Sequence, residues 1–112
     1  MRGYSLKTRS GAKVERARFG ELGEALSALE RRGEELQDGA SSRPVDLRMG
    51  RRFEPVQQVM ARLELAGPGG LRAGVDVRGD GSASAYLGWV RRRAVEQQGH
   101  ESPYEALRRA LG

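Results

Sequence analysis

The 112-residue chain contains no cysteine, one histidine and few aromatic residues, and these shortages exclude several classes of chemistry. Without cysteine there is no disulfide, no thiol nucleophile and no thiolate zinc or iron–sulfur site. His100 stands alone in the polar run 97–101, with no second nitrogen ligand and no nucleophile turn near it. We therefore predict that the protein is not an enzyme and holds no metal or cofactor.

Long apolar segments are also missing from the sequence. Nothing approaches the run of about eighteen apolar residues that marks a membrane-spanning helix, and no apolar stretch of signal-peptide length follows the N-terminal residues 1–5. Hydrophobic residues make up 38% of the chain and charged residues 31%, as in ordinary globular domains. We expect one soluble, cytoplasmic domain over residues 1–112, with no membrane partner.

Positive charge is in excess, and it is unevenly distributed. The net charge is +5, and apart from Lys7 and Lys13 every basic residue is arginine. Residues 1–19 hold six basic side chains and one acidic side chain, whereas residues 20–42 hold six acidic side chains and two arginines. Runs of charge usually pair with the opposite sign or keep a domain soluble, and we favour that interpretation of the arginines over phosphate binding.

Two helices are predicted from periodicity and capping signals. Apolar residues recur at three- and four-residue steps over 21–37, and Asp38-Gly39 supplies a stop signal. A second helix starts at about residue 103, with Ser102 as N-cap and Glu105 at the capping-box position. Before the first helix, two short strands at 4–8 and 12–19 indicate a hairpin extension, and the proline-containing segment 39–55 is a loop or an edge strand.

Between the helices, alternating apolar residues predict a three-stranded meander. If Gly81 is left-handed in a three-residue turn, the second hairpin pairs Val77–Ala83, Val75–Ala85, Ala73–Leu87 and Leu71–Trp89. The first hairpin is predicted to pair Leu65–Leu71, Leu63–Ala73, Ala61–Val75 and Val59–Val77. The opposite face then gains a Glu64–Arg72 pair and Tyr86 over Gly74. A helix over 83–98 is the alternative, but it explains none of these pairings.

The predicted fold is therefore α+β: a three-stranded antiparallel meander with two helices packed on one face, in the order α-β-β-β-α, preceded by the N-terminal hairpin. Over about 80 residues this element order is similar to that of the double-stranded-RNA-binding domain. That family places lysines at the start of its last helix, whereas this chain has Glu101 and Glu105 there. No functional residue is carried over from the resemblance.

Two functions remain open from the sequence. The first is a non-catalytic protein-interaction module that binds another protein or a second copy of itself through an exposed sheet face, to which we assign Met60, Arg62, Arg72 and Tyr86. The alternative is an arginine-rich nucleic-acid-binding domain that contacts phosphates without strong sequence specificity. No small-molecule ligand is evident. The candidate phosphate or partner contacts are Arg48, Arg51, Arg52, Arg91, Arg92 and Arg93.

Overall fold

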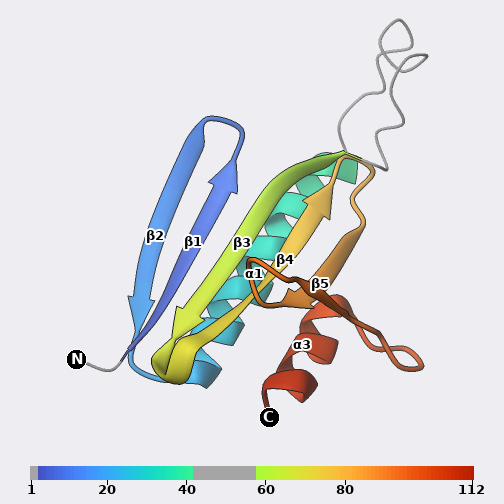
Figure 1. Ribbon diagram of the computed structural model, residues 1–112. Helices are drawn as coiled ribbons and strands as arrows, with labels where there is room; N and C mark the ends of the chain where they lie inside the picture. Colours follow the sequence, from blue (N-terminus) through green and yellow to red (C-terminus); the bar gives the residue numbers. More distant parts are fainter. Residues whose placement is uncertain (1–2, 42–57) are drawn as a thin grey trace, which may run out of the picture.

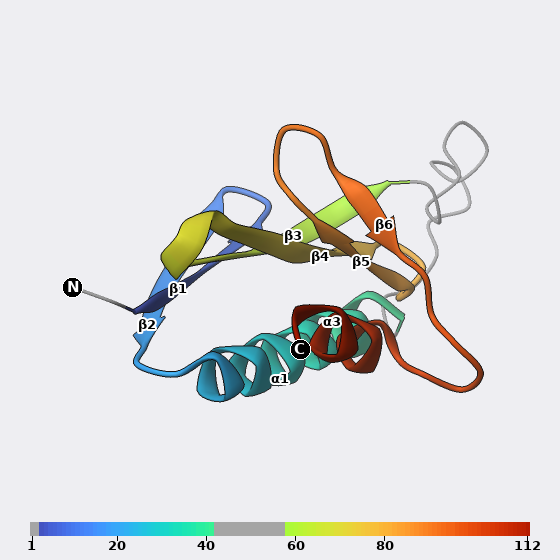
Figure 2. The ribbon, with the colours of Figure 1, turned by 60° about the horizontal axis from the view of Figure 1, so that its bottom comes forward.

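Two helices cover one face of a six-stranded antiparallel sheet in the computed structural model, which describes residues 3–41 and 58–112 (Figures 1 and 2). The strand order across the sheet is β2-β1-β3-β4-β5-β6. In chain order the elements are β1 (Tyr4–Ser10), β2 (Lys13–Phe19), α1 (Leu22–Ser41), β3 (Val59–Gly67), the short 3-10 helix η2 (Pro68–Gly70), β4 (Leu71–Arg78), β5 (Ala83–Leu87), β6 (Arg93–Val95) and α3 (Pro103–Leu111).

The predicted three-stranded fold in the order α-β-β-β-α is wrong. The N-terminal hairpin is part of the sheet, because β1 pairs with β3 along its length and places Leu6 beside the buried Leu65. On the other side, β6 pairs with β5. With only three residues, β6 is too short to show an alternating pattern in the sequence. Within residues 3–41 and 58–112 the order of helices and strands is thus β-β-α-β-β-β-β-α, and the similarity in element order to the double-stranded-RNA-binding domain disappears with it.

The core lies between the sheet and the helices. Alternate residues of β3 and β4 point at the helices, and Leu63 and Val75 among them are fully buried. From the other side, α1 contributes Leu29 and α3 contributes Leu107, which are equally inaccessible. Each helix is amphipathic and buries its apolar stripe against this one face of the sheet, so the opposite face stays uncovered by helices.

Helix α1 agrees with the predicted helix over 21–37 but extends beyond it. Asp38-Gly39 does not stop the helix, which continues to Ser41, because Gly39 keeps a negative φ and Ala40 adds another buried residue to the stripe. Of the segment 39–55, which we predicted as a loop or edge strand, residues 39–41 are therefore helical and the remainder lies outside the described residues. Gly33 is needed inside α1, since a Cβ there would lie 2.3 Å from the Tyr104 hydroxyl.

The second hairpin has the predicted register over three of its four pairs. Gly81 is left-handed at φ 89°, and the Arg78 amide donates to the Ser82 carbonyl at 2.8 Å. The pairs Val77–Ala83, Val75–Ala85 and Ala73–Leu87 are confirmed, and residues 83–87 are a strand rather than a helix. The predicted Leu71–Trp89 pair is wrong, because Gly88 has a φ of 81° and takes the chain out of β5.

The first hairpin is offset by two residues from the prediction. Its loop is the compact η2, so Gly67 pairs with Leu71 and Leu65 pairs with Ala73. A two-residue offset keeps every apolar side chain on the same face, which is why the burial pattern survives the error. The predicted Glu64–Arg72 pair is lost, and Glu64 lies opposite Gly74 instead. An irregularity between Val59 and Ala61 ends the regular pairing.

The C-terminal helix has the predicted cap. The Ser102 hydroxyl accepts from the Glu105 amide at 3.0 Å, and the Glu105 carboxylate accepts from the Ser102 amide at 2.8 Å. Arg109 holds the preceding turn through Glu101, with Nε to Oε2 at 2.9 Å. No helix in the described part of the chain is long and apolar enough to cross a membrane.

Candidate functional site

The sheet face opposite the helices is strongly basic. Figure 2 shows both helices on one side and the loop between β5 and β6 rising over the other. Strand register places two acidic side chains, Glu64 and Asp76, on this open face. The basic side chains that share the face, or are held against it from the β5–β6 loop, are Lys7, Arg9, Arg16, Arg18, Arg62, Arg72, Arg78 and Arg92.

Asp76 is the centre of a tight cluster on the open face. Its residue is only 7% exposed, and its two carboxylate oxygens accept from Arg62 Nε at 2.9 Å and Arg92 Nη2 at 2.5 Å. The hydrogen bond to Asp76 raises the pKa of the Arg62 guanidinium. Because Arg62 is on β3 and Arg92 is in the β5–β6 loop, this carboxylate fastens the loop down onto the sheet.

Tyr86 is buried, contrary to the prediction that it belongs to the exposed face. The guanidinium of Arg92 stacks on its ring, 3.6 Å from the centroid, and the residue retains 5% exposure. Burial raises the pKa of the Tyr86 phenol to about 12. Below the ring, Gly74 permits the close approach that we predicted, because a Cβ there would meet both the Tyr86 hydroxyl and the Leu63 carbonyl oxygen.

Five of the cations on this face have no ion pair among residues 3–41 and 58–112. Arg72 lies against Trp89 and Arg78 donates to the Ser84 hydroxyl, whereas no side-chain partner is found among those residues for Lys7, Arg16 and Arg18. They line a hollow of about 260 Å³ together with Glu64 and Trp89. Glu64 is engaged by Arg9, at 3.5 Å from Nε to Oε1. The hollow therefore contains more positive than negative charge, and its three cations are available to a ligand.

Trp89 lies over the open face instead of the core where its predicted register placed it. Its indole nitrogen donates to the Ala73 carbonyl at 3.2 Å, and the Arg72 guanidinium lies 4.9 Å from the ring centroid. Trp89 remains 39% exposed. Sequence reasoning missed this residue as a surface feature; the signal that could have found it is Gly88, whose preferred left-handed conformation ends a strand.

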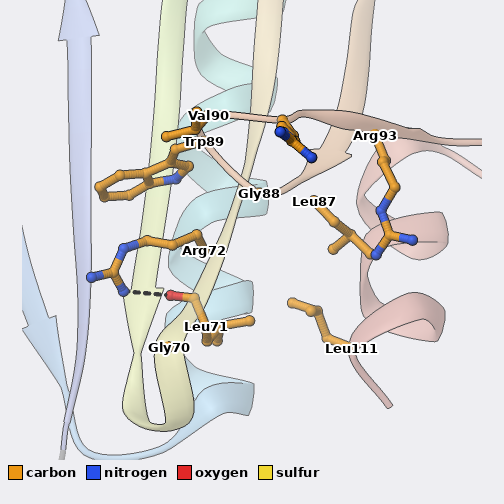
Figure 3. A pocket seen from close by; sticks show the side chains of 10 residues that line it. Gly70, Leu71, Arg72, Leu87, Gly88, Trp89, Val90, Arg93 and Leu111 are labelled. Carbon is orange, nitrogen blue, oxygen red and sulfur yellow. Dashed lines mark hydrogen bonds between the residues drawn. The ribbon is translucent and has the colours of Figure 1, made fainter.

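A second hollow, of about 710 Å³, lies on the other side of the Gly88 turn, between the η2 end of β4 and the C-terminal helix (Figure 3). Its apolar lining comes from Leu71, Leu87 and Leu111. Arg91 and Arg93 line it as well, and Figure 3 shows Arg93 beside Leu87. It shares Trp89 and Arg72 with the open face.

The predicted arginine cluster is split by the structure. Arg92 turns onto the open face while its neighbours Arg91 and Arg93 line the second hollow, so the three do not converge. Arg62 and Arg72 lie on the open face. The assignment of Met60 to the exposed face is wrong, because the irregularity in β3 changes the alternation there and Met60 packs, partly buried, against the core. The other predicted contacts, Arg48, Arg51 and Arg52, lie outside the described residues.

Within the described ranges, no group of three or more metal-ligating residues comes together, and His100 lies in an exposed turn between β6 and α3. Comparison with known proteins finds no match: no family model fits the chain, and no curated protein or solved structure is significantly similar to it. Function is therefore inferred from the open face itself.

Proposed function

We propose that the protein is a non-catalytic module that binds nucleic acid in the cytoplasm, with the open sheet face contacting phosphates without strong sequence specificity. The observation that carries this proposal is the charge of that face, where eight basic side chains accompany two acidic ones. Both acids are already engaged by arginines. A polyanion would meet an excess of cations that the fold does not neutralise.

On the other side of the sheet, α1 carries a net negative charge, while the shorter α3 has Arg108 and Arg109 against Glu105. Helix α1 contains two arginines, Arg31 and Arg32, against five acidic residues: Glu24, Glu30, Glu34, Glu35 and Asp38. The sheet thus separates a basic surface from an acidic one, and the resulting field turns the open face toward an approaching polyanion. A protein that was basic only for solubility would not need this separation.

The available side chains suit phosphate recognition. Arg16 and Arg18 are exposed on β2, at the edge of the sheet, and Lys7 is on the neighbouring β1. Guanidinium groups bind phosphate oxygens through two parallel hydrogen bonds, while the lysine ammonium acts as a point charge. Successive side chains of a strand point to opposite faces, and the register pairs Lys7 with Arg16 and Ser5 with Arg18. The three cations therefore lie on the same face of this hairpin, where one strand of a phosphate backbone can reach all of them.

Titration of labelled oligonucleotides by fluorescence anisotropy over a salt series tests this proposal. Binding should weaken steeply as salt rises, because each neutralised phosphate releases counterions. The open-face variant K7Q/R16Q/R18Q should lose most of the affinity and flatten the salt slope. A matched control, K13Q/R31Q/R108Q, removes the same charge from the helix side and should retain binding. Equal losses in the two variants, or no binding of the unaltered protein at low salt, would overturn the proposal.

Association with an acidic protein surface is the second candidate, and the same charge separation favours it. The open face of one copy complements the acidic α1 of another, which would give a head-to-tail contact instead of a two-fold dimer. Such a contact should strengthen with concentration and dissolve with salt. Light scattering over a dilution and salt series tests this candidate, and a monomer at high concentration and low salt would exclude self-association.

A further inference from the structure

We propose that the hollow beside Trp89 receives an unpaired nucleobase, so that the protein prefers single-stranded nucleic acid to duplex. This inference rests on the proposed function and specifies its ligand. The hollow joins an exposed aromatic ring to three unpaired cations, Lys7, Arg16 and Arg18, which is the combination that single strands require. A duplex keeps its bases stacked inside and would present only phosphates to this surface.

The indole is held in place before any ligand arrives. One edge is fixed by the hydrogen bond from Nε1 to the Ala73 carbonyl, and the turn before Trp89 is fixed by the Gly88 amide, which donates to the Arg72 carbonyl at 2.7 Å. Arg92, three residues further on, is fastened to Asp76. A ring anchored on both sides loses little conformational entropy when a base stacks on it.

Glu64 distinguishes a hollow for a base from a hollow for a phosphate. Its side chain is the acidic member of the lining and would repel a phosphate placed against it. A carboxylate instead accepts hydrogen bonds from the amino groups of bases such as cytosine. The lining is thus matched to a nucleotide, with Trp89 and Glu64 facing the base while Lys7, Arg16 and Arg18 hold the flanking phosphates.

Trp89 is the one tryptophan of the chain, so its fluorescence reports directly on this site. The probes are an oligo(dC) of about 12 nucleotides, which spans a typical single-strand site, a duplex of the same length, and inorganic polyphosphate. We expect oligo(dC) to quench the fluorescence and to bind about tenfold more tightly than the duplex at equal salt. Polyphosphate should bind with little quenching.

Two variants at residue 89 separate stacking from folding. Trp89→Phe keeps an aromatic ring and should retain most of the preference for oligo(dC), measured by anisotropy. Trp89→Leu should weaken oligo(dC) binding about tenfold and leave duplex binding unchanged, which also shows that the variant is folded. E64Q serves as a second probe: polyphosphate should bind it more tightly, because the charge that repels phosphate is gone, and its preference for oligo(dC) over polyphosphate should fall.

The outcomes distinguish this inference from the function on which it rests. Equal affinity for oligo(dC) and duplex, or a Trp89→Leu variant that binds oligo(dC) normally, would overturn the stacking site while leaving phosphate binding in place. Loss of binding to both nucleic acids in Trp89→Leu, with Trp89→Phe unaffected, would make Trp89 a structural residue and would also overturn it. Failure of every polyanion to bind would instead remove the proposed function.

Discussion

The two faces of this sheet are made by the same strands and stabilised by different physics. On the helix side, Leu63 and Val75 are fully buried, and burial of apolar surface holds the layers together. One residue along each strand, Arg62 and Asp76 point the other way and form a charged cluster with Arg92. Alternation of side chains along each strand thus gives one face of the sheet the stabilising apolar contacts and leaves the other face available for binding.

Both sides nevertheless use the same device, a tyrosine ring packed over a glycine. Between the helices Tyr104 covers Gly33, and its hydroxyl donates to Gln37 Oε1 at 2.5 Å. On the open face Tyr86 covers Gly74. Burial raises the pKa of both phenols. The two rings differ in their surroundings: Tyr104 belongs to the hydrophobic core, whereas Tyr86 has the Arg92 guanidinium stacked on its ring.

The largest difference between the two faces should be in the free energy of unfolding that is lost when a side chain is truncated to alanine. Leu63→Ala removes a fully buried side chain and leaves a cavity, so we expect a loss of about 2–5 kcal/mol in the free energy of unfolding. Arg16→Ala on the exposed face should change that free energy by less than about 0.5 kcal/mol. Urea denaturation followed by circular dichroism measures both. A similar cost for the two variants would contradict the assignment of stability to the helix side.

A smaller effect is expected from Asp76→Asn, which tests whether the charged cluster contributes to the fold. The change removes two charge-assisted hydrogen bonds, but both arginines are about one-third exposed, so we expect a loss of about 1–3 kcal/mol. Release of Arg92 should also free the β5–β6 loop and shift the Trp89 emission to longer wavelength.

Asp80→Asn is the control for that variant, because Asp80 lies in an exposed turn and its carboxylate accepts from the Ser82 amide. It should destabilise less and leave the emission unchanged. If Asp76→Asn and Asp80→Asn behave alike, the cluster does not fasten the loop.

Features of the fold that depend on neighbouring residues could be predicted from the sequence, whereas features that depend on contacts between distant residues could not. The turn with Gly81 and the cap with Ser102 were correct, because local backbone preferences decide them. The place of β1–β2 in the sheet was not decided locally, since it depends on the pairing of Leu6 with the distant Leu65. The sequence predicted which face of the sheet stays open. It did not predict that Arg92 packs on Tyr86 and Asp76, because this contact depends on a loop that returns over the sheet, for which sequence spacing gives no signal.

The smallest expected effect is on the pH dependence of stability, and it tests whether the packing of Arg92 keeps water from the Tyr86 hydroxyl. The pKa of this phenol is raised from 10.0 to about 12, so below pH 10 it is protonated in both the folded and the unfolded chain. Between pH 10 and about 12 the unfolded chain ionises first, and stability falls as pH rises. Tyr86→Phe retains the ring under Arg92 and removes the ionisation. The variant should therefore lose about 1–2 kcal/mol less than the unaltered protein between pH 9 and pH 11.5, as judged by urea midpoints. Identical alkaline losses would mean that water already reaches the Tyr86 hydroxyl and that Arg92 does not seal this part of the open face.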